Sequence, residues 1–398
     1  MGLFDVLNIN RKQPKKVDFK RYIVPQQNYR TRQDIQKFRE AVLTAENVHL
    51  PNRRQLYKGY QDAWDDAHVK AVINNRKLKT LGKDFAICNE EGEEIEDITV
   101  LFKSEWFRQF IDYALDSIYW GHSLIELGDI IDDQFKEVTL VKRENVRPEF
   151  HTVTKNSSDI PTDGIKYDED IYKNWNIGVG HDYDLGLLKS IMPLWIYKKE
   201  SLGGWSQYTE IFGQPMRVGK TNTTNEGDRE HMEEQLQNMG SSAYAVIGQD
   251  DEFQFLFPND GAAFKSYEDL CRFCDEQISK IVFGQTMTSD NGSSRSQSEV
   301  HERLAEDYVR ADSMMIENLV NQELIPRMRN LGITIPECYF KFDSKERVTS
   351  NEQFERVKEL IKSYDVDPEY IEKEFNIPVT LKAQSTFGGS AEGKYLTL

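Results

Sequence analysis

The stretch that decides the fold begins at Tyr267 and ends at Arg329: YEDLCRFCDEQISKIVFGQTMTSDNGSSRSQSEVHERLAEDYVRADSMMIENLVNQELIPRMR. Both ends of the stretch repeat apolar residues at steps of three and four, the spacing of one face of an α-helix. These apolar positions are Tyr267, Leu270, Cys274, Ile278 and Ile281 in the first part, and Val300, Leu304, Tyr308, Ala311, Met315, Leu319 and Leu324 in the second. The stretch therefore predicts two successive amphipathic helices.

Between the two predicted helices lies a polar segment, residues 284–297, which has no periodicity and consists of turn-forming residues. Ser298 is a typical N-cap, and Glu299 and Glu302 then stand in the first turn, where the helix dipole favours acids. A second helix of roughly thirty residues is about 45 Å long, well beyond the usual three to four turns. By itself, this pattern also fits an ordinary helical hairpin with a flexible connection.

Length and hydropathy limit the class of protein. At 398 residues the chain has room for two or three domains, and its mean hydropathy of −0.65 is typical of a soluble protein. No apolar run approaches the roughly 20 residues of a membrane-spanning helix, and residues 1–6 show neither a secretory-signal nor a myristoylation pattern. The Cys271–Cys274 pair is expected to pack in a core, in a reducing compartment.

Charge is distributed unevenly along the chain. The formal net charge is −17, but residues 1–60 hold thirteen Lys and Arg against five Asp and Glu. The basic arm within them, Arg11–Arg21, either contacts nucleic acid or an acidic partner or is a solvated tail. The acidic remainder argues against a protein that grips phosphates over a broad surface, because tight DNA binding neutralises phosphates with Lys and Arg.

The sequence lacks the motifs of common enzymes. It contains no Gly-x-Ser-x-Gly elbow, no phosphate loop and no dinucleotide fingerprint. The seven histidines are scattered and form no His-x-x-x-His pair, so a histidine-based metal site is unsupported. With 67 carboxylates, chance Asp/Glu pairs carry no information. We therefore predict a protein without enzymatic activity, metal or cofactor; a nuclease or protease of a mobile element would need a convergent constellation that is not found.

Outside the opening stretch, apolar periodicity predicts further elements and a mainly helical α+β fold. The predicted helices cover residues 31–46, 60–81, 106–119, 187–212, 230–239, 351–364 and 368–375. The predicted strands cover residues 84–88, 124–130, 135–141, 147–152, 216–218, 243–247, 253–257, 334–335 and 339–342, with 243–247 and 253–257 expected to pair. Gly121 is expected to end the helix before it.

Several stretches of residues 60–330 together resemble the phage Mu-like portal protein family. The stretch Ile278–Thr288 is similar to the family pattern Ile-x-Lys-x-x-Leu-Gly-Gln-Thr-Leu-Thr, with Phe283 and Met287 replacing leucines. The strongest match begins at Pro193–Lys199. The other matching residues are Asp66, His68, Val69, Asn75–Lys77, Asp84–Ile87, Ala114–Glu126, Gly204, Trp205, Phe212–Pro215, Arg217–Lys220 and His301. The order and spacing of these segments make the resemblance specific.

The resemblance implies a portal fold assembled as a ring, with twelve copies expected, at one vertex of a phage capsid. DNA would be packaged and ejected through the ring channel, without sequence preference. Carried over to this chain, the parts are a basic N-terminal arm (1–29), a wing (30–186), stem helices (187–212 and 262–283), a clip (213–261), a tunnel loop (284–297), a tunnel helix (298–331), wing return strands (332–345) and a small crown with the C-terminal tail (346–398).

The partners that the resemblance implies are double-stranded DNA, the terminase large subunit, a head–tail adaptor and the major capsid or scaffold protein. The implied location is the virion, after assembly in the host cytoplasm. The alternative is another ring-forming head–tail connector or a capsid-associated structural protein.

Two sets of site residues follow from the resemblance. The tunnel loop would line the DNA channel with Thr286, Met287, Thr288, Ser289, Asp290, Asn291, Ser293, Ser294 and Arg295. Hydroxyl and amide groups of this kind offer weak, sequence-blind hydrogen bonds to phosphate, and Asp290 offsets the one cation, Arg295, which is otherwise a solvated loop residue. Aromatic residues of the stem helices are expected to pack between helices or between subunits; they are Trp195, Trp205, Tyr208 and Phe212.

Overall fold

The computed structural model of the chain describes residues 27–212, 217–221, 225–238, 244–248, 262–284, 295–343 and 357–359. The chain divides into two units, Met1–Phe342 and Asp343–Leu398. Helices and strands are mixed and helices predominate, so the predicted mainly helical α+β class is confirmed. The first unit contains two large hydrophobic cores, and both draw residues from the helices α5 (Glu105–Trp120) and α10 (Arg295–Leu319).

The first of these cores, the sheet core, combines helices with two small sheets. β2 is the central strand of an antiparallel three-stranded sheet in the order β5-β2-β9, and β1 pairs antiparallel with β12. Phe85 therefore lies opposite Phe342, although more than half the chain separates them. The bounds of these elements are β1 Phe85–Cys88, α4 Glu96–Phe102, β2 His122–Leu127, β5 Val138–Leu140, β9 Asn176–Gly180 and β12 Tyr339–Phe342.

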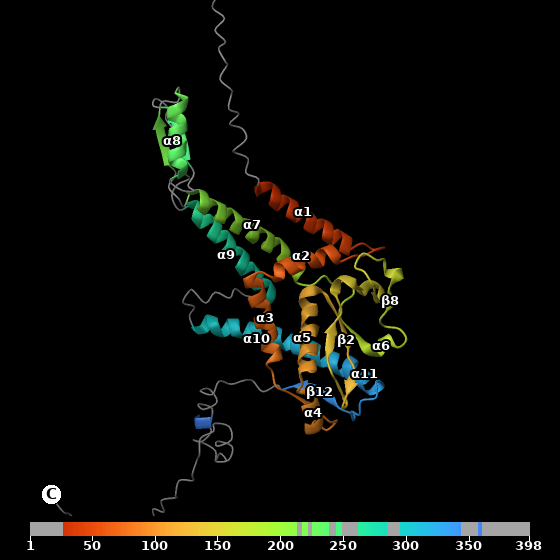
Figure 1. Ribbon diagram of the computed structural model, residues 1–398. Coiled ribbons are helices and arrows are strands. Elements are labelled where there is room, and N and C mark those ends of the chain that lie inside the picture. The colour runs from red at the N-terminus through yellow and green to blue at the C-terminus, as the bar shows by residue number, and fades with distance from the viewer. Residues whose placement is uncertain are drawn as a thin grey trace, which may run out of the picture. The chain divides into compact units, whose positions relative to one another are not determined.

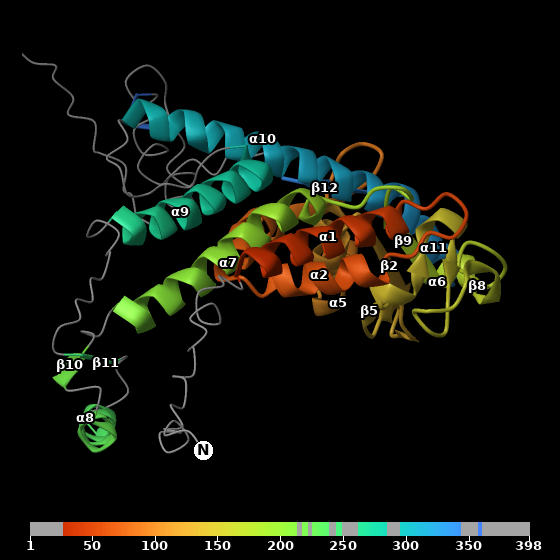
Figure 2. The same ribbon diagram turned by 90° about the horizontal axis from the view of Figure 1, so that it is seen from above.

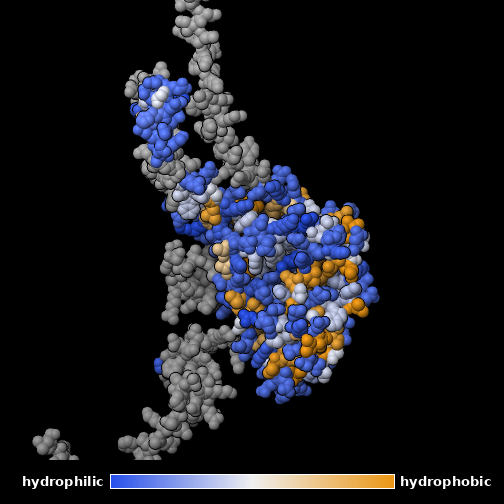
Figure 3. All heavy atoms as spheres, in the orientation of Figure 1, coloured by the Kyte–Doolittle hydropathy of each residue, from blue (hydrophilic) through white to orange (hydrophobic). Residues whose placement is uncertain are grey.

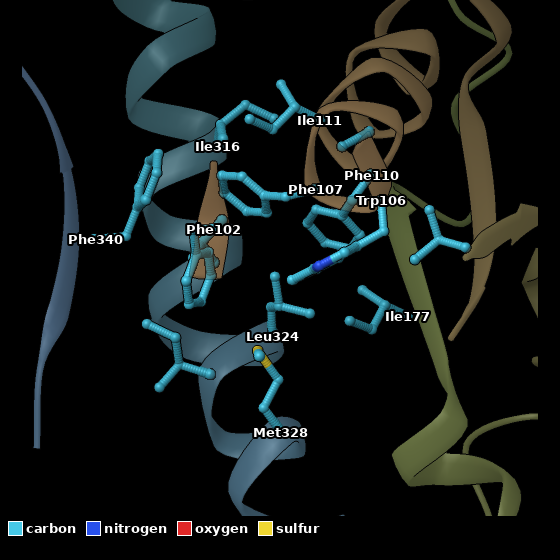
Figure 4. Close-up of a cluster of buried hydrophobic side chains, with 14 of the residues drawn as sticks. Phe102, Trp106, Phe107, Phe110, Ile111, Ile177, Ile316, Leu324, Met328 and Phe340 are labelled. Atoms are coloured by element: carbon cyan, nitrogen blue, oxygen red, sulfur yellow. The ribbon is translucent and has the colours of Figure 1, made fainter. Parts of the chain in front are cut away.

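Aromatic rings of α5 fill the centre of the sheet core (Figure 4). The buried residues of α5 recur at helical spacing, so one face of the helix is apolar. The ring of Phe107 lies 4.8 Å from that of Phe102 and 5.5 Å from that of Phe340, measured between centroids. Both pairs have the edge-to-face geometry that aromatic side chains prefer. Gly121 follows the last residue of α5, where the sequence predicted the helix to end.

The long helix predicted after the polar segment is present but is not uniform. α10 passes into a π-helical turn, Val320–Leu324, and continues as α11 (Ile325–Asn330). Asn321 in this turn donates its amide to the carbonyl of Phe340 and accepts from the Phe340 backbone N–H. The π-turn, which the sequence did not predict, thus connects the helix to β12. The helix also begins at Arg295, three residues before the predicted N-cap Ser298.

The second core, the helix core, is built only from helices and the segment before α7. α7 lies alongside α1 and α9, and α2 and α3 pack beneath them (Figures 1 and 2). The stretch predicted as one helix over residues 60–81 forms two, because Asp66 caps α3 by accepting hydrogen bonds from two backbone N–H groups. The bounds are α1 Gln27–Ala45, α2 Arg54–Trp64, α3 Ala67–Leu81, α7 Leu188–Phe212 and α9 Ala262–Phe283.

A separate small module lies between α7 and α9 in the sequence. It consists of β10 (Arg217–Thr221), α8 (Glu226–Asn238) and β11 (Tyr244–Gly248), and its two strands are parallel. Gly219 of β10 lets α8 approach closely, since a Cβ there would come within 2.8 Å of Met232. The sequence predicted residues 243–247 to pair with 253–257; the observed partner of β11 is β10, and 253–257 lie outside the described residues.

The segment from 128 to 186 contains only short elements, which the composition of residues 153–186, rich in Asp, Gly and Asn, predicts for that part alone. The predicted strands over 135–141 and 147–152 are each divided into shorter pieces. The first becomes β4 (Gln134–Phe135) and β5, and the second becomes β6 (Val146–Arg147), a 3-10 turn (Pro148–Phe150) and β7 (Thr152–Val153). Other short elements of the segment are β3 Ile130–Ile131, β8 Ile165–Lys166 and the short helix α6 Tyr172–Trp175. Residues 334–335 are not a strand either, and the predicted helix over 351–364 is described only at 357–359.

Candidate functional site

The junction between α9 and α10 frames the segment predicted to line a DNA channel. Thr286, Met287, Thr288, Ser289, Asp290, Asn291, Ser293 and Ser294 lie outside the described residues. Arg295 was predicted in the loop but is the first residue of α10, so the predicted loop boundary at residue 297 is wrong, while a place for Arg295 in a channel stays a prediction. The described part of the site is therefore its frame: the end of α9 with Gly284, and the start of α10.

One guanidinium joins this frame. Arg76, buried on α3, donates two parallel hydrogen bonds to the carboxylate of Asp312 on α10, from Nε at 2.8 Å and from Nη2 at 2.7 Å. Its remaining nitrogen, Nη1, donates to the carbonyl oxygen of Val282 at the end of α9, at 2.7 Å. The same guanidinium lies 4.7 Å from the ring centroid of Tyr308 on α10. Three helices thus meet at one side chain.

The surroundings of Arg76 keep it charged. Burial by itself disfavours the cation, but the hydrogen bonds that Arg76 donates to Asp312, together with the negative charge of that carboxylate, outweigh this cost and raise the pKa of Arg76. Val282 also belongs to the last turn of α9, whose carbonyls have no donor within the helix. A buried cation at that end both satisfies a carbonyl and complements the helix dipole.

Gly284 completes the frame on the α9 side. Its φ of +71° is in the left-handed region, and a Cβ at this position would come within 2.9 Å of the Tyr308 hydroxyl oxygen. The Gly284 N–H donates to the carbonyl of Lys280 at 2.8 Å, which closes the last turn of α9. Tyr308 therefore contacts the residue that ends α9 and also stacks on the guanidinium of Arg76.

A second buried cation holds α9 further from the junction. Lys198 of α7 is paired with Asp66 at 2.9 Å and with Asp275 of α9 at 2.7 Å. His68 of α3 lies 2.9 Å from the backbone carbonyl of Asp275 and 2.9 Å from the hydroxyl of Ser279, so its Nε2 carries the proton that the carbonyl accepts. The last turns of α9 are thus held by α3 at two levels.

The four aromatic residues predicted to pack in the stem differ in their surroundings. Trp195 is half-buried against the helix core of its own chain, with Lys199 lying 5.1 Å from its ring centroid. The ring of Tyr208 lies 6.2 Å from that of Tyr267 on α9, and Trp205 is half-buried. The side chain of Phe212 is outside the described residues. Packing between helices is therefore present for Trp195 and Tyr208, while packing between subunits stays a prediction.

The outer faces of α7 and α9 also expose large apolar side chains. They are Tyr197 and Leu202 on α7, and Leu270 and Phe273 on α9, of which Phe273 is 53% exposed. By contrast, the visible face of α8 is strongly hydrophilic (Figure 3). Exposed apolar side chains therefore occur on the paired helices, as they do elsewhere in the described residues, but not on the visible face of α8.

Sequence reasoning missed Arg76, Asp312 and Lys198. A signal for Asp312 was present, because Ala305, Val309, Ile316 and Val320 define the buried face of α10 and a charged residue shares their spacing. Such a residue requires a buried cation as its partner. The partner itself, 236 residues away, has no local signal.

The described residues offer no site for a metal ion, since they contain no group of three or more His, Cys, Asp or Glu side chains in suitable positions. Cys271 and Cys274 are both free thiols buried on α9, as the core interpretation predicted. Among the described helices, none is long and apolar enough to cross a membrane.

Comparison with known proteins decides the family. Residues 57–377 match the family described as portal protein of Mu bacteriophage, which is most of the chain. The chain belongs to the Mu portal protein family. It is 28% identical to the portal protein of Escherichia phage Mu over 144 residues, which are 35% of this chain and 28% of that protein.

A second relative comes from a bacterial genome. The chain is 24% identical to the Mu-like prophage FluMu protein gp29 of Haemophilus influenzae over 106 residues, which are 26% of this chain and 20% of that protein. In both cases the alignment spans between a fifth and a third of the relative's length. The resemblance inferred from the sequence motifs is confirmed by the family match.

Proposed function

We propose that this member of the Mu portal family forms a ring at one vertex of a phage capsid, and that DNA passes through the ring during packaging and ejection. The observation that carries the proposal is the family match over residues 57–377. The order of the elements supports it: two long helices, α7 and α9, enclose a small α/β module in sequence, and α9 is followed by the still longer run α10–α11.

In this proposal α7 and α9 are the stem, the β10–α8–β11 module belongs to the clip, and α10 is the tunnel helix. The exposed apolar side chains of α7 and α9 support a contact between copies, because a closed ring joins two different faces of each subunit. The clip would face the terminase large subunit and later the head–tail adaptor. The wing, assigned to residues 30–186 and 332–345, would face the capsid or scaffold protein.

The polar segment 285–294 suits a channel that DNA must slide through. It carries one acidic residue, Asp290, and no Lys or Arg. Each phosphate neutralised by a cation adds affinity through counterion release, so a segment without cations contacts DNA without retaining it. Its hydroxyl and amide groups would position the duplex and carry no sequence preference. The protein would contribute no chemistry of its own.

The decisive experiment is electron microscopy of the purified protein together with its native mass. Rings with a central channel and a mass about twelve times 46.4 kDa are expected. The alternative is another ring-forming structural protein, a head–tail connector. Observing whether the ring is located inside an assembled capsid distinguishes a portal from a connector. A compact monomer or dimer, in the presence of scaffold protein as well, would contradict the proposal.

A loop variant tests the channel assignment separately. Removing residues 288–293 should leave the ring intact, because the two hydrophobic cores of the described residues are built from other parts of the chain. The same variant should reduce the amount of DNA packaged or retained per particle, measured by quantitative PCR of nuclease-treated particles. A matched deletion in the acidic turn 89–94 is the control for shortening an exposed turn. Normal DNA content in the loop variant would refute the assignment.

A further inference from the structure

We propose that Arg76 is the positioning residue that sets the geometry between α9 and α10, and hence the placement of both ends of the predicted channel segment. The functional part of this statement rests on the proposed portal role. The geometric part does not, because it concerns only helices whose contacts are described. The guanidinium contacts the last turn of α9 and the interior of α10 at the same time.

The donor set of Arg76 is used in two directions. The fork formed by Nε and Nη2 is occupied by Asp312, which fixes the plane of the guanidinium relative to α10. With the plane fixed, Nη1 points to the Val282 carbonyl, which fixes the end of α9. A lysine at this position retains the charge but has no fork, so it can satisfy either helix without orienting one against the other.

The location of Asp312 on α10 makes this contact a joint between the two cores. Ala305, two turns before Asp312, belongs to the helix core, and Ile316, one turn after it, belongs to the sheet core. The Arg76–Asp312 pair therefore lies where α10 leaves one core and enters the other. Arg76 itself is on α3, which the helix core holds through Val69, Val72 and Ile73.

Tyr308 gives the joint a second point of contact with the end of α9. Its ring stacks on the Arg76 guanidinium and its edge occupies the space where Gly284 would carry a Cβ. Loss of the cation would therefore release Tyr308 as well as the Val282 carbonyl. Lys198 and His68 hold α9 about two turns earlier, so the freedom gained on losing Arg76 is rotation of α9 about that second attachment.

The test measures distances between spin labels by double electron–electron resonance. One label replaces the exposed Lys265 near the start of α9, and the other replaces the exposed Asn318 on α10. Lys265 is about 25 Å along the helix from Val282, so a small rotation becomes a large displacement. Cys338, the half-buried cysteine, is replaced by serine, and labelled protein is diluted with unlabelled protein to exclude distances between copies.

The key variant is the double substitution Arg76→Met with Asp312→Leu. Replacing both members of a buried ion pair with apolar residues is often neutral for stability, whereas removing only one member is strongly destabilising. We expect the melting temperature to stay within a few degrees while the 265–318 distance distribution broadens or shifts. Arg76→Lys should change the 265–318 distance distribution in the same way but by less. If the double variant fails to fold, Arg76→Lys takes its place as the test.

Two controls separate positioning from general loosening. Arg53 and Glu149 form a buried pair at 2.6 Å, and Arg53 also donates to backbone carbonyls, so Arg53→Met with Glu149→Leu removes a matched set of contacts elsewhere. This control variant should leave the 265–318 distance unchanged. A second label pair, at Arg108 on α5 and Asn318, reports on the sheet core and should not change in the Arg76 variants.

An unchanged 265–318 distance in Arg76→Met/Asp312→Leu would overturn the proposal, as would an equal change in the Arg53 control. The portal role is judged independently, by ring formation in electron microscopy. A shifted distance in a protein that forms no ring would retain the joint and reject the portal function. A protein that forms rings but whose 265–318 distance is unchanged in the Arg76 variant would retain the portal function and reject the proposed role of Arg76.

Discussion

The sheet core and the helix core of the first unit are stabilised in different ways. In the sheet core, aromatic rings from α4, α5, β1 and β12 contact one another edge to face, and the hydrophobic effect requires no specific partner. In the helix core, apolar packing is accompanied by buried cations, Arg76 and Lys198, which each link more than one helix. The first core favours compactness, and the second fixes the relative orientation of helices.

The places of the buried cations agree with this difference between apolar packing and ion pairing. Apolar side chains tolerate small rotations, because dispersion contacts are numerous and individually weak. A forked hydrogen bond between charged groups has a narrow geometry. The cations link α3, α7, α9 and α10, and Arg76 does so at the last turn of α9. Under the proposed portal function, the orientation of α9 and α10 at this point would decide where the segment between them is held in the ring.

The largest expected effect concerns the sheet core. Phe107→Ala should lower the free energy of unfolding by about 3–5 kcal/mol, because it removes a ring that contacts several other rings and leaves a cavity. Denaturant unfolding measures the change. The same substitution at Phe150, which is 40% exposed, is the matched control and should cost far less. Equal losses for the two variants would mean that the sheet core is not the chief source of stability.

The next effect concerns a buried histidine, His122, at the start of β2, the central strand of the sheet β5-β2-β9. Burial lowers the pKa of His122 to about 3, so the folded protein keeps this imidazole neutral at pH values where the unfolded chain protonates it. The stabilisation is complete above the ordinary histidine pKa of about 6.5 and is lost as the pH falls towards 3. At pH 5 the loss relative to pH 7 is about 2 kcal/mol.

Measuring unfolding midpoints between pH 4 and pH 8 for the native protein and for His122→Asn checks this expectation, since the variant should lose this part of the acid sensitivity. His151→Asn is the contrasting control. Slight burial opposes the charge of His151, but the hydrogen bonds that its ring donates to Asp182 and Asp168 raise its pKa, so the stabilisation by His151 is lost as the pH rises through that value. An acid profile unchanged by His122→Asn would show that His122 is not the group responsible.

The sequence predicted much of the fold because local patterns determine it. The apolar repeats of α5, α7 and α9 placed those helices within a residue or two, except that α9 begins five residues before its first predicted apolar position. Gly121 was located as the end of α5 from its residue type alone. The π-turn at Val320–Leu324 was missed, and its Asn321 is hydrogen-bonded to the distant strand β12, a contact that no local pattern shows.

The candidate site was less predictable than the fold. The motif Asn75–Lys77 contributed to the family resemblance, yet nothing in it shows that Arg76 pairs with Asp312 and Val282. Partners so far apart in sequence are brought together only by the packing of α3 against α9 and α10. The start of α10 was placed three residues late, because Ser298 satisfies the local rule for an N-cap and the true helix begins earlier.

The smallest expected effect concerns the glycine that ends α9, and it distinguishes backbone conformation from contact. Gly284 and Gly332 both have left-handed φ values, but a Cβ at Gly332 meets no atom within 4 Å whereas one at Gly284 meets Tyr308. Gly332→Ala should therefore cost about 1 kcal/mol from backbone strain alone, and Gly284→Ala roughly twice that. Denaturant midpoints measure both costs.

A Tyr308→Leu background is the control. There the stability costs of the two glycine substitutions should become nearly equal, because the aromatic side chain that crowds position 284 is gone. If Gly284→Ala still costs more than Gly332→Ala in the Tyr308→Leu background, then Tyr308 does not anchor the end of α9. The joint at Arg76 would then act through the Val282 carbonyl alone.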